Sequence, residues 1–270
     1  MSMDQIAREG LVLLGCGKMG SAMLAGWLDQ GLPPTSVWVI DPKPSAWLQG
    51  TGVYVNAALP QSPAIVLIAV KPQILRDALP QIAAMTGAVL LSVAAGTSIA
   101  SFEDVFGGDA RVIRAMPNTP AAVGKGITAI VGNEEATGAD LDMAEMLLSA
   151  VGQVVRLDHE DQMDAVTGVS GSGPAYVFHM IECMAAAGEA QGLAPELAMQ
   201  LAKATVAGAG ALAQAADETP AQLRVNVTSP NGTTQAGLEV LMDETAGLAP
   251  LVKATVAAAT DRSKELKRGG

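Results

Sequence analysis

Apolar positions follow two different patterns in the two halves of this 270-residue chain. In the first half, short apolar runs alternate with amphipathic segments, which is typical of buried parallel strands separated by helices. The runs lie at residues 11–14, 37–40, 53–55, 64–70, 88–93, 112–115, 127–131 and 153–157. In the second half, long Ala-rich segments with helical spacing replace them. The pattern therefore predicts an α/β fold, with a doubly wound sheet followed by an all-α domain.

Proline and glycine mark the limits of the predicted helices in the second half. The helices are expected at residues 175–191, 195–216, 221–227 and 248–266, with a further one starting at residue 233. The sequence SGSGP at residues 170–174 predicts a flexible hinge ahead of the first. A domain boundary near residues 158–161 divides the chain into residues 1–160 and 161–270.

A glycine-rich turn follows the first predicted strand directly. Gly15, Gly17 and Gly20 stand between that strand and an amphipathic segment, with Lys18 and Met19 inside the same turn. In this context Gly15 allows a tight turn, Gly17 lets backbone approach a diphosphate, and Gly20 permits close contact between helix and strand. The first domain is therefore predicted to be a Rossmann-type domain that binds a dinucleotide on the helix N-terminus.

The end of the second predicted strand carries mixed signals about the cofactor. Asp41 lies about twenty residues past the glycines, where an acid commonly accepts a hydrogen bond from the adenosine ribose and disfavours a 2′-phosphate. Taken alone, Asp41 indicates NAD. However, Lys43 and Ser45 follow at once and are suited to a 2′-phosphate, unless Lys43 is only a solvated loop charge. The sequence leaves NADPH and NADH open.

Ligands of a doubly wound sheet bind beyond the carboxyl ends of its strands, so the residues after each apolar run are cofactor candidates. They are Asn56, Lys71, Pro72, Ala94, Ala95, Gly96 and the segment from Met116 to Pro120. Lys71 is either catalytic, a source of general positive field, or without a role. The amide of Asn118 suits a nicotinamide ribose or ring, and the alternative is a turn residue beside proline.

A sharp turn in the second half gathers hydrogen-bond donors. Pro230 interrupts the helix, the next two residues tolerate positive φ, and Thr233 and Thr234 then open a new apolar helical pattern. Hydroxyls and free backbone N–H groups at a helix start can hold a carboxylate or phosphate, leaving the hard chemistry to a cofactor. The alternative is an ordinary capped turn between two helices.

Composition and charge restrict the partners. The net charge of −11 repels phosphate backbones and anionic membrane surfaces, so neither nucleic acid nor a membrane is expected. Cys16 and Cys183 are the only cysteines and lack metal-ligand spacing, so no disulfide and no metal site is predicted.

The N-terminus lacks the form of a signal peptide, and a cytoplasmic protein is expected. Abundant small residues suit close helix packing or a subunit interface.

Several motifs together resemble those of pyrroline-5-carboxylate reductases, and the resemblance covers essentially the whole chain. They lie at residues 15–20 (GCGKMG), 70–72 (VKP), 116–120 (MPNTP), 170–176 (SGSGPAY) and 227–234 (VTSPNGTT). The last is the most specific, because it resembles the family signature that holds the substrate carboxylate. The family usually has a second glycine where this chain has Asn231, a residue that tolerates the left-handed conformation.

The resemblance implies reduction of (S)-1-pyrroline-5-carboxylate to L-proline with NADPH or NADH, usually NADPH. It also implies a homodimer through the helical domain, and in many members a decamer of five dimers. Each active site would then join one subunit's Rossmann domain to its partner's anion loop, residues 228–234. Ser229, Gly232, Thr233 and Thr234 would hold the carboxylate, with Asn226 nearby and Thr234 also bonded to the ring nitrogen as the catalytic contact. Asn56, Val70, Lys71 and Pro72 would lie along the cofactor, with Ala69, Ala95, Gly96 and Asn118 near its nicotinamide half.

Two other functions compete with this one. A two-domain β-hydroxyacid dehydrogenase has a similar plan, but its catalytic lysine is followed by Asn or Asp three or four residues on, and neither follows Lys203 or Lys253 in this way. A catalytically silent redox sensor would bind the dinucleotide alone. The donors at residues 229–234 disfavour a sensor, which has no use for them.

Overall fold

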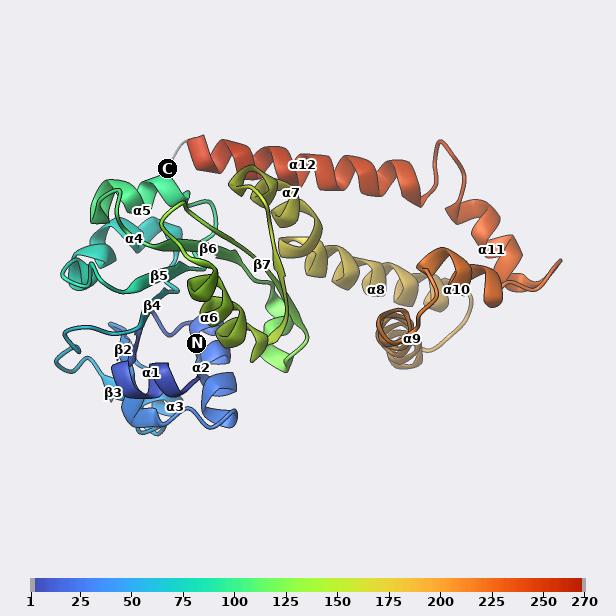
Figure 1. Ribbon diagram of the computed structural model, residues 1–270. Helices are drawn as coiled ribbons and strands as arrows, with labels where there is room; N and C mark the ends of the chain where they lie inside the picture. The colour runs from blue at the N-terminus through green and yellow to red at the C-terminus, as the bar shows by residue number, and fades with distance from the viewer. Residues whose placement is uncertain (1–2, 269–270) are drawn as a thin grey trace. The chain divides into compact units, whose positions relative to one another are not determined.

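The computed structural model describes residues 3–268 and divides the chain into two compact units (Figure 1). The first contains the described residues up to Gly171 together with those from Ala259 onward, and the second spans Ser172–Ala258. The first unit holds all the strands of the described chain, and the second is helical. This division confirms the predicted order of an α/β region followed by an all-α region.

The first unit is built on an eight-stranded sheet with the order β3-β2-β1-β4-β5-β6-β7-β8. The strands are β1 Leu11–Leu14, β2 Val37–Ile40, β3 Tyr54–Val55, β4 Ile65–Ile68, β5 Val89–Ser92, β6 Val112–Met116, β7 Gly126–Gly132 and β8 Gly152–Arg156. Each overlaps one of the predicted runs. The order reverses at β1, which places a topological switch point beside the glycine-rich turn.

The sheet is mixed, which the apolar runs did not reveal. Strands β1 to β6 are parallel, whereas β7 runs antiparallel to β6, and β8 is parallel to β7. The connection from β6 to β7 holds only a 3-10 turn, η3 Thr119–Val123. A parallel neighbour needs a crossover of about a dozen residues or more, so this short link reverses the strand direction.

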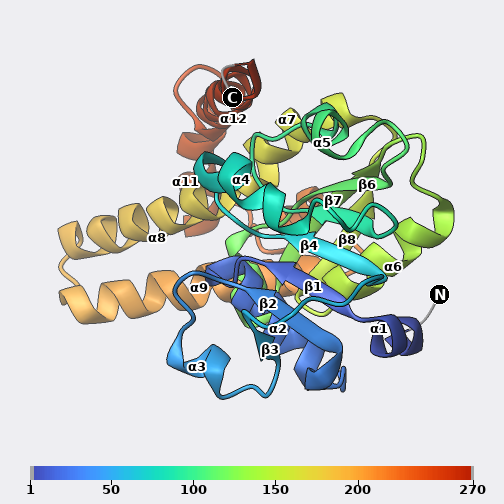
Figure 2. The same ribbon diagram turned by 90° about the vertical axis from the view of Figure 1, so that its left-hand side faces the viewer.

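Helices cover both faces of the sheet, as Figure 2 shows for the first unit. Alternate residues of β1 point to opposite sides: Leu11 and Leu13 belong to one core cluster, and Val12 and Leu14 to the other. The α-helices of this unit are α1 Met3–Glu9, α2 Lys18–Asp29, α3 Ala46–Gln49, α4 Pro72–Ala78, α5 Ile99–Phe106, α6 Gly138–Ser149, α7 Met163–Val166 and the last part of α12 Leu248–Arg268. This arrangement confirms the doubly wound architecture.

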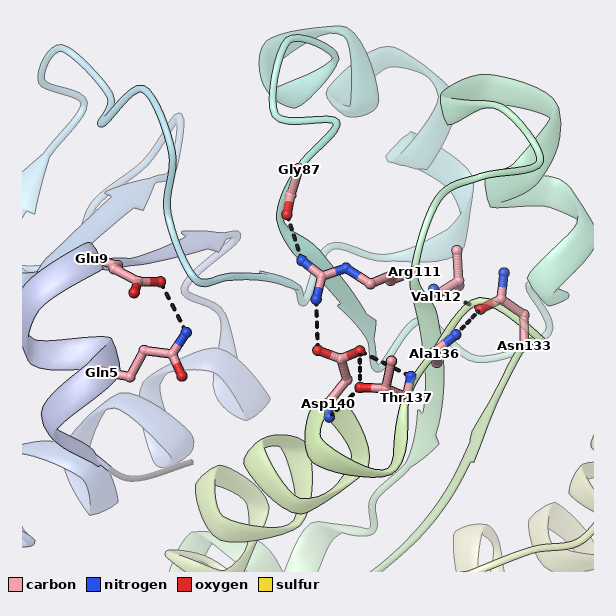
Figure 3. A network of polar contacts seen from close by, with 9 residues as sticks. All are labelled: Gln5, Glu9, Gly87, Arg111, Val112, Asn133, Ala136, Thr137 and Asp140. Carbon is pink, nitrogen blue, oxygen red and sulfur yellow. Dashed lines mark hydrogen bonds and ion pairs between the residues drawn. The ribbon is translucent and has the colours of Figure 1, made fainter.

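A buried carboxylate fixes the start of α6 (Figure 3). Asp140 is fully buried, accepts hydrogen bonds from the backbone and hydroxyl of Thr137 in a capping box, and pairs with Arg111 at 2.8 Å. The other guanidinium nitrogen of Arg111 donates to the carbonyl of Gly87. The capping box and the ion pair therefore tie α6 to the segments that lead into β5 and β6.

The first unit extends beyond the predicted boundary at residue 160. After η4 Glu160–Gln162 and α7, residues Thr167–Gly171 form a π-helix, and α8 starts at Gly173. The predicted hinge at residues 170–174 contains the boundary between the two units, which falls between Gly171 and Ser172, and the stretch is helical except for a bend at Ser172. A Cβ on Gly171 would lie 2.6 Å from Cε of Met116, so the π-helix packs closely against the carboxyl end of β6.

The second unit consists of α8 Gly173–Ala190, α9 Pro195–Ala215, α10 Pro220–Asn226, α11 Thr233–Leu241 and the first part of α12 Leu248–Arg268. Within residues 172–258 the buried hydrophobic residues are three alanines, Ala185, Ala198 and Ala202. Large apolar side chains such as Phe178, with 58% of its surface exposed, lie outside this small core. Such a unit buries too little apolar surface to be stable without further packing.

None of the helices within residues 3–268 combines the length and the apolar character that a membrane span requires.

Candidate functional site

The glycine-rich turn has the geometry of a dinucleotide cradle. Gly15 has φ +91° and donates its N–H to the carbonyl of Ile40 at 2.8 Å, which confirms the predicted tight turn. Gly17 caps α2, and a Cβ added there would meet nothing within 4 Å, so its surroundings are open. A Cβ on Gly20 would run into the carbonyl oxygen of Gly15. The exposed start of α2, with Lys18 and Met19 in its first turn, therefore faces space that a diphosphate can occupy.

A hydrogen-bond cluster holds Asp41 against this turn. One carboxylate oxygen of Asp41 accepts from the backbone N–H of Cys16 at 2.8 Å, and the other accepts from that of Lys43 at 2.8 Å. Asn56, in the left-handed conformation at φ +52°, uses its side-chain amide to bond both the N–H and the C=O of Asp41. Asp41 therefore stabilises the glycine-rich turn through its hydrogen bond with the N–H of Cys16. Its position at the end of a strand did not indicate this role.

The thiol of Cys16 lies half-buried in the middle of the turn. Burial, and after it the nearby Asp41 carboxylate, raises the pKa of this thiol to about 11. The protonated thiol is therefore the dominant form at neutral pH, and a thiolate nucleophile is not available there.

The remaining cofactor candidates follow the carboxyl ends of β3 to β6. Because these strands are parallel, their carboxyl ends lie together at one end of the sheet. Ala69 and Val70 pack beneath the turn, since a Cβ on Gly15 would lie 2.8 Å from Cγ1 of Val70 and 3.1 Å from the carbonyl of Ala69. The exposed Lys71 caps α4, with Pro72 at its first position. The loop between β5 and α5 contributes exposed Ala95 and then Gly96, at φ +72°.

The side-chain amide of Asn118 makes hydrogen bonds within the fold. The residue is 9% exposed, its Oδ1 accepts from the N–H of Ile127 at 3.0 Å, and its Nδ2 donates to the carbonyl of Ser170 at 3.1 Å. Both ends of the amide are used within the fold. The structure therefore gives Asn118 a positioning role, joining the loop after β6 to β7 and to the π-helix.

One polar cluster of this unit was missed by the sequence reasoning. Arg114 lies inside β6 with 3% of its side chain exposed and pairs with Glu160 at 2.7 Å. The same Glu160 oxygen accepts from the N–H of Ile99, the first residue of α5, at 3.0 Å. The sequence signal for this cluster was Arg114, a charged residue within an apolar run. A charged side chain that is buried requires a partner.

The anion loop of the second unit, residues 228–234, follows α10 and includes the first two residues of α11. Asn231 adopts the left-handed conformation at φ +57°, as its sequence context predicts, whereas Gly232 is extended. A Cβ on Gly232 would lie 3.0 Å from the carbonyl oxygen of Ser229, so a side chain there would require the turn to shift by a few tenths of an ångström. Gly232 gives α11 no side-chain cap, and the first N–H groups of the helix stay free for a ligand.

The polar side chains of the anion loop divide into two groups. Thr228 is committed within the fold, since its hydroxyl donates to the carbonyl of Arg224 at 2.6 Å. Ser229, Thr233 and Thr234 are exposed. Asn226, at the end of α10, accepts from the Gln222 amide at 2.8 Å. Exposed hydroxyls and free N–H groups make the loop a set of donors suited to a carboxylate.

Comparison with known proteins gives family matches in both units. Residues 160–266 match the family model described as pyrroline-5-carboxylate reductase dimerisation. Residues 10–96 match the model described as NADP oxidoreductase, coenzyme F420-dependent. The pyrroline-5-carboxylate reductase of Pseudomonas aeruginosa is 36% identical over 264 residues, which cover 95% of this chain and 96% of that protein.

Solved structures agree with the sequence matches. A pyrroline-5-carboxylate reductase from Coxiella burnetii superposes with a TM-score of 0.88 at 31% identity, covering 96% of this chain and 98% of that one. The pyrroline carboxylate reductase of Plasmodium falciparum, solved with NADP bound, gives a TM-score of 0.81 at 28% identity, with the same coverages of 96% and 98%. The chain belongs to the pyrroline-5-carboxylate reductase family.

Proposed function

We propose that this protein reduces (S)-1-pyrroline-5-carboxylate to L-proline, the last step of proline biosynthesis, using NADPH or, as a second choice, NADH. The observation that carries the proposal is the anion loop with exposed hydroxyls and free helix N–H groups, in a chain that also contains a glycine-rich dinucleotide cradle. Open space at Gly17 and the tight packing at Gly20 fit a dinucleotide diphosphate. When bound, the nicotinamide supplies the hydride.

The residues of the chain then have to orient the imine and balance its charge. The free N–H groups at the start of α11, with the hydroxyls of Ser229 and Thr233, hold the substrate carboxylate, and extended Gly232 keeps the loop tight. The Thr234 hydroxyl hydrogen-bonds the ring nitrogen. A cyclic imine takes its proton from water, so positioning and charge matter more than a strong acid or base.

The direct test is steady-state oxidation of NADPH and NADH by the purified protein with pyrroline-5-carboxylate, with proline quantified as the product. Stoichiometric proline formation is the expected result. A folded protein that binds dinucleotide but makes no proline with either cofactor would contradict the proposed reaction.

Lys43 is proposed to read the 2′-phosphate of NADPH. Its side chain is exposed, and the neighbouring Asp41 carboxylate is engaged by two backbone N–H groups. Lys43→Ala should raise the Kd of NADPH roughly tenfold, by loss of one charge-assisted contact, and leave that of NADH unchanged. Titration of both cofactors by fluorescence measures this.

The matched control is Lys203→Ala, which removes an exposed lysine from α9 in the second unit. It should change neither Kd. Equal weakening of NADPH and NADH by Lys43→Ala would show that this lysine does not read the 2′-phosphate.

We also propose a homodimer through the helical unit, with five dimers forming a decamer. The small alanine core and the exposed apolar side chains of residues 172–258 support the dimer. Sedimentation velocity should give only even-numbered species, with the decamer dominant at high concentration. A monomer at micromolar concentration would contradict the dimer, and a dimer alone at all concentrations would contradict the decamer.

A cytoplasmic location is part of the same proposal. Cys16 and Cys183 are both free, as expected in a reducing compartment. Cell fractionation tests it, and recovery of the protein in an extracytoplasmic fraction would contradict it.

A further inference from the structure

A short segment of the first unit, η4 and α7, carries two acidic side chains that reach different neighbours. Glu160 contacts the first N–H of α5 and the buried Arg114, as described above. Asp164, four residues on, accepts a hydrogen bond from the hydroxyl of Ser263 at 2.7 Å. Because one short helical segment carries both carboxylates, it connects the start of α5 to the end of α12.

The contact between Asp164 and Ser263 is a buried latch between distant parts of the sequence. The exposed fractions of the two residues are 7% and 6%, and 99 positions separate them. Both views place the C-terminal end of α12 beside α5 and α7 (Figures 1 and 2). A hydroxyl donating to a buried carboxylate is a strong, charge-assisted contact, and leaving the carboxylate without it is costly.

The latched end of α12 lies against the loop between β5 and α5. Leu266 is three residues beyond Ser263, on the same side of the helix. A Cβ added to Gly96 would lie 3.8 Å from Cβ of Leu266, an ordinary packing distance. Gly96 is held at φ +72°, and Ile99 at the other end of the loop is bound by Glu160. The loop is therefore confined on both sides by groups that η4 and α7 position.

We propose that Asp164 and Ser263 are positioning residues that hold the β5–α5 loop in the shape that receives the nicotinamide half of the dinucleotide. The inference rests on the proposed function only in placing the nicotinamide at this loop. Neither residue touches the cofactor. They act through Leu266 and Gly96, and the adenosine half, at the glycine-rich turn, does not depend on them.

The test compares a whole dinucleotide with its adenosine half. Ser263→Ala should raise the Kd of NADPH roughly fivefold, the equivalent of one lost hydrogen bond, and leave the Kd of 2′,5′-ADP unchanged. Asp164→Ala should do the same, whereas Asp164→Asn keeps an acceptor oxygen and should restore most of the NADPH affinity. Combining Ser263→Ala with Asp164→Ala should add little to either change alone.

Asp261→Ala is the matched control, because Asp261 lies on the same helix but is exposed and paired with Lys264. It should alter neither Kd. If the latch variants weaken NADPH and 2′,5′-ADP equally, or lower the melting temperature with both Kd values unchanged, the positioning role is wrong. The Kd values of both ligands are measured without turnover. These measurements therefore test the positioning role of Asp164 and Ser263 separately from the proposed reaction.

Discussion

Replacing Thr234 by alanine should lower kcat/KM for pyrroline-5-carboxylate roughly a hundredfold, the scale of losing one transition-state donor. Thr234 is exposed in the first turn of α11, where the helix has no side-chain cap. Its hydroxyl is proposed to bond the ring nitrogen, a contact that strengthens as the nitrogen changes charge during reduction. The Kd of NADPH should stay nearly constant, since the glycine-rich cradle is in the other unit.

Two further variants sharpen this prediction. Thr234→Ser keeps the hydroxyl and should retain most of the activity, while Thr205→Ala removes an exposed threonine from α9 and should have no effect. Steady-state kinetics with varied imine and saturating NADPH give the comparison. Unchanged turnover in Thr234→Ala would remove this residue from the mechanism.

Alanine at Gly17 should weaken NADPH roughly 10- to 100-fold without changing the melting temperature, because its Cβ would occupy the space through which backbone N–H groups reach the diphosphate. That space is empty within 4 Å, and φ −71° with ψ −159° is available to any residue.

Gly20→Ala should act differently. Its Cβ meets the Gly15 carbonyl, so both cofactor affinity and stability should fall, the latter by about 1–3 kcal/mol.

Gly138→Ala serves as the control, since Gly138 starts α6 in open space and alanine is the better helix former. Isothermal titration with NADPH and thermal unfolding of all three variants separate the two effects. A destabilised Gly17→Ala protein, or a Gly20→Ala protein as stable as the wild type, would contradict these separate roles for the glycines.

Short-range patterns in the sequence determined the positions of the elements. Each predicted strand appears within a few residues of its expected position, and the long helices of the second half begin near Pro174, Pro195 and Leu248. The glycine-rich turn and the turn at Asn231 were also readable, since both depend on backbone conformations that only a few residue types accept. Such signals are local, because the residues that impose them lie within one turn or strand.

The sequence was least informative about hydrogen bonds between a side chain and a residue far away in the sequence. The Asn118 amide looked free for a ligand, but the fold brings Ile127 and Ser170 to it and uses both of its ends. Asp41 looked like a ribose acceptor, and in the structure it also braces the N–H of Cys16. The position of each residue along the chain does not reveal these contacts.

The sequence by itself therefore determined the two-part α/β and all-α plan, the dinucleotide turn and the anion loop. Tertiary structure alone decided the return of residues from Ala259 onward to the first unit and the contact of Ser263 with Asp164. The physical reason is the same in both cases. Long-range packing and long-range hydrogen bonds depend on which segments meet after folding, and no local period or propensity encodes that meeting.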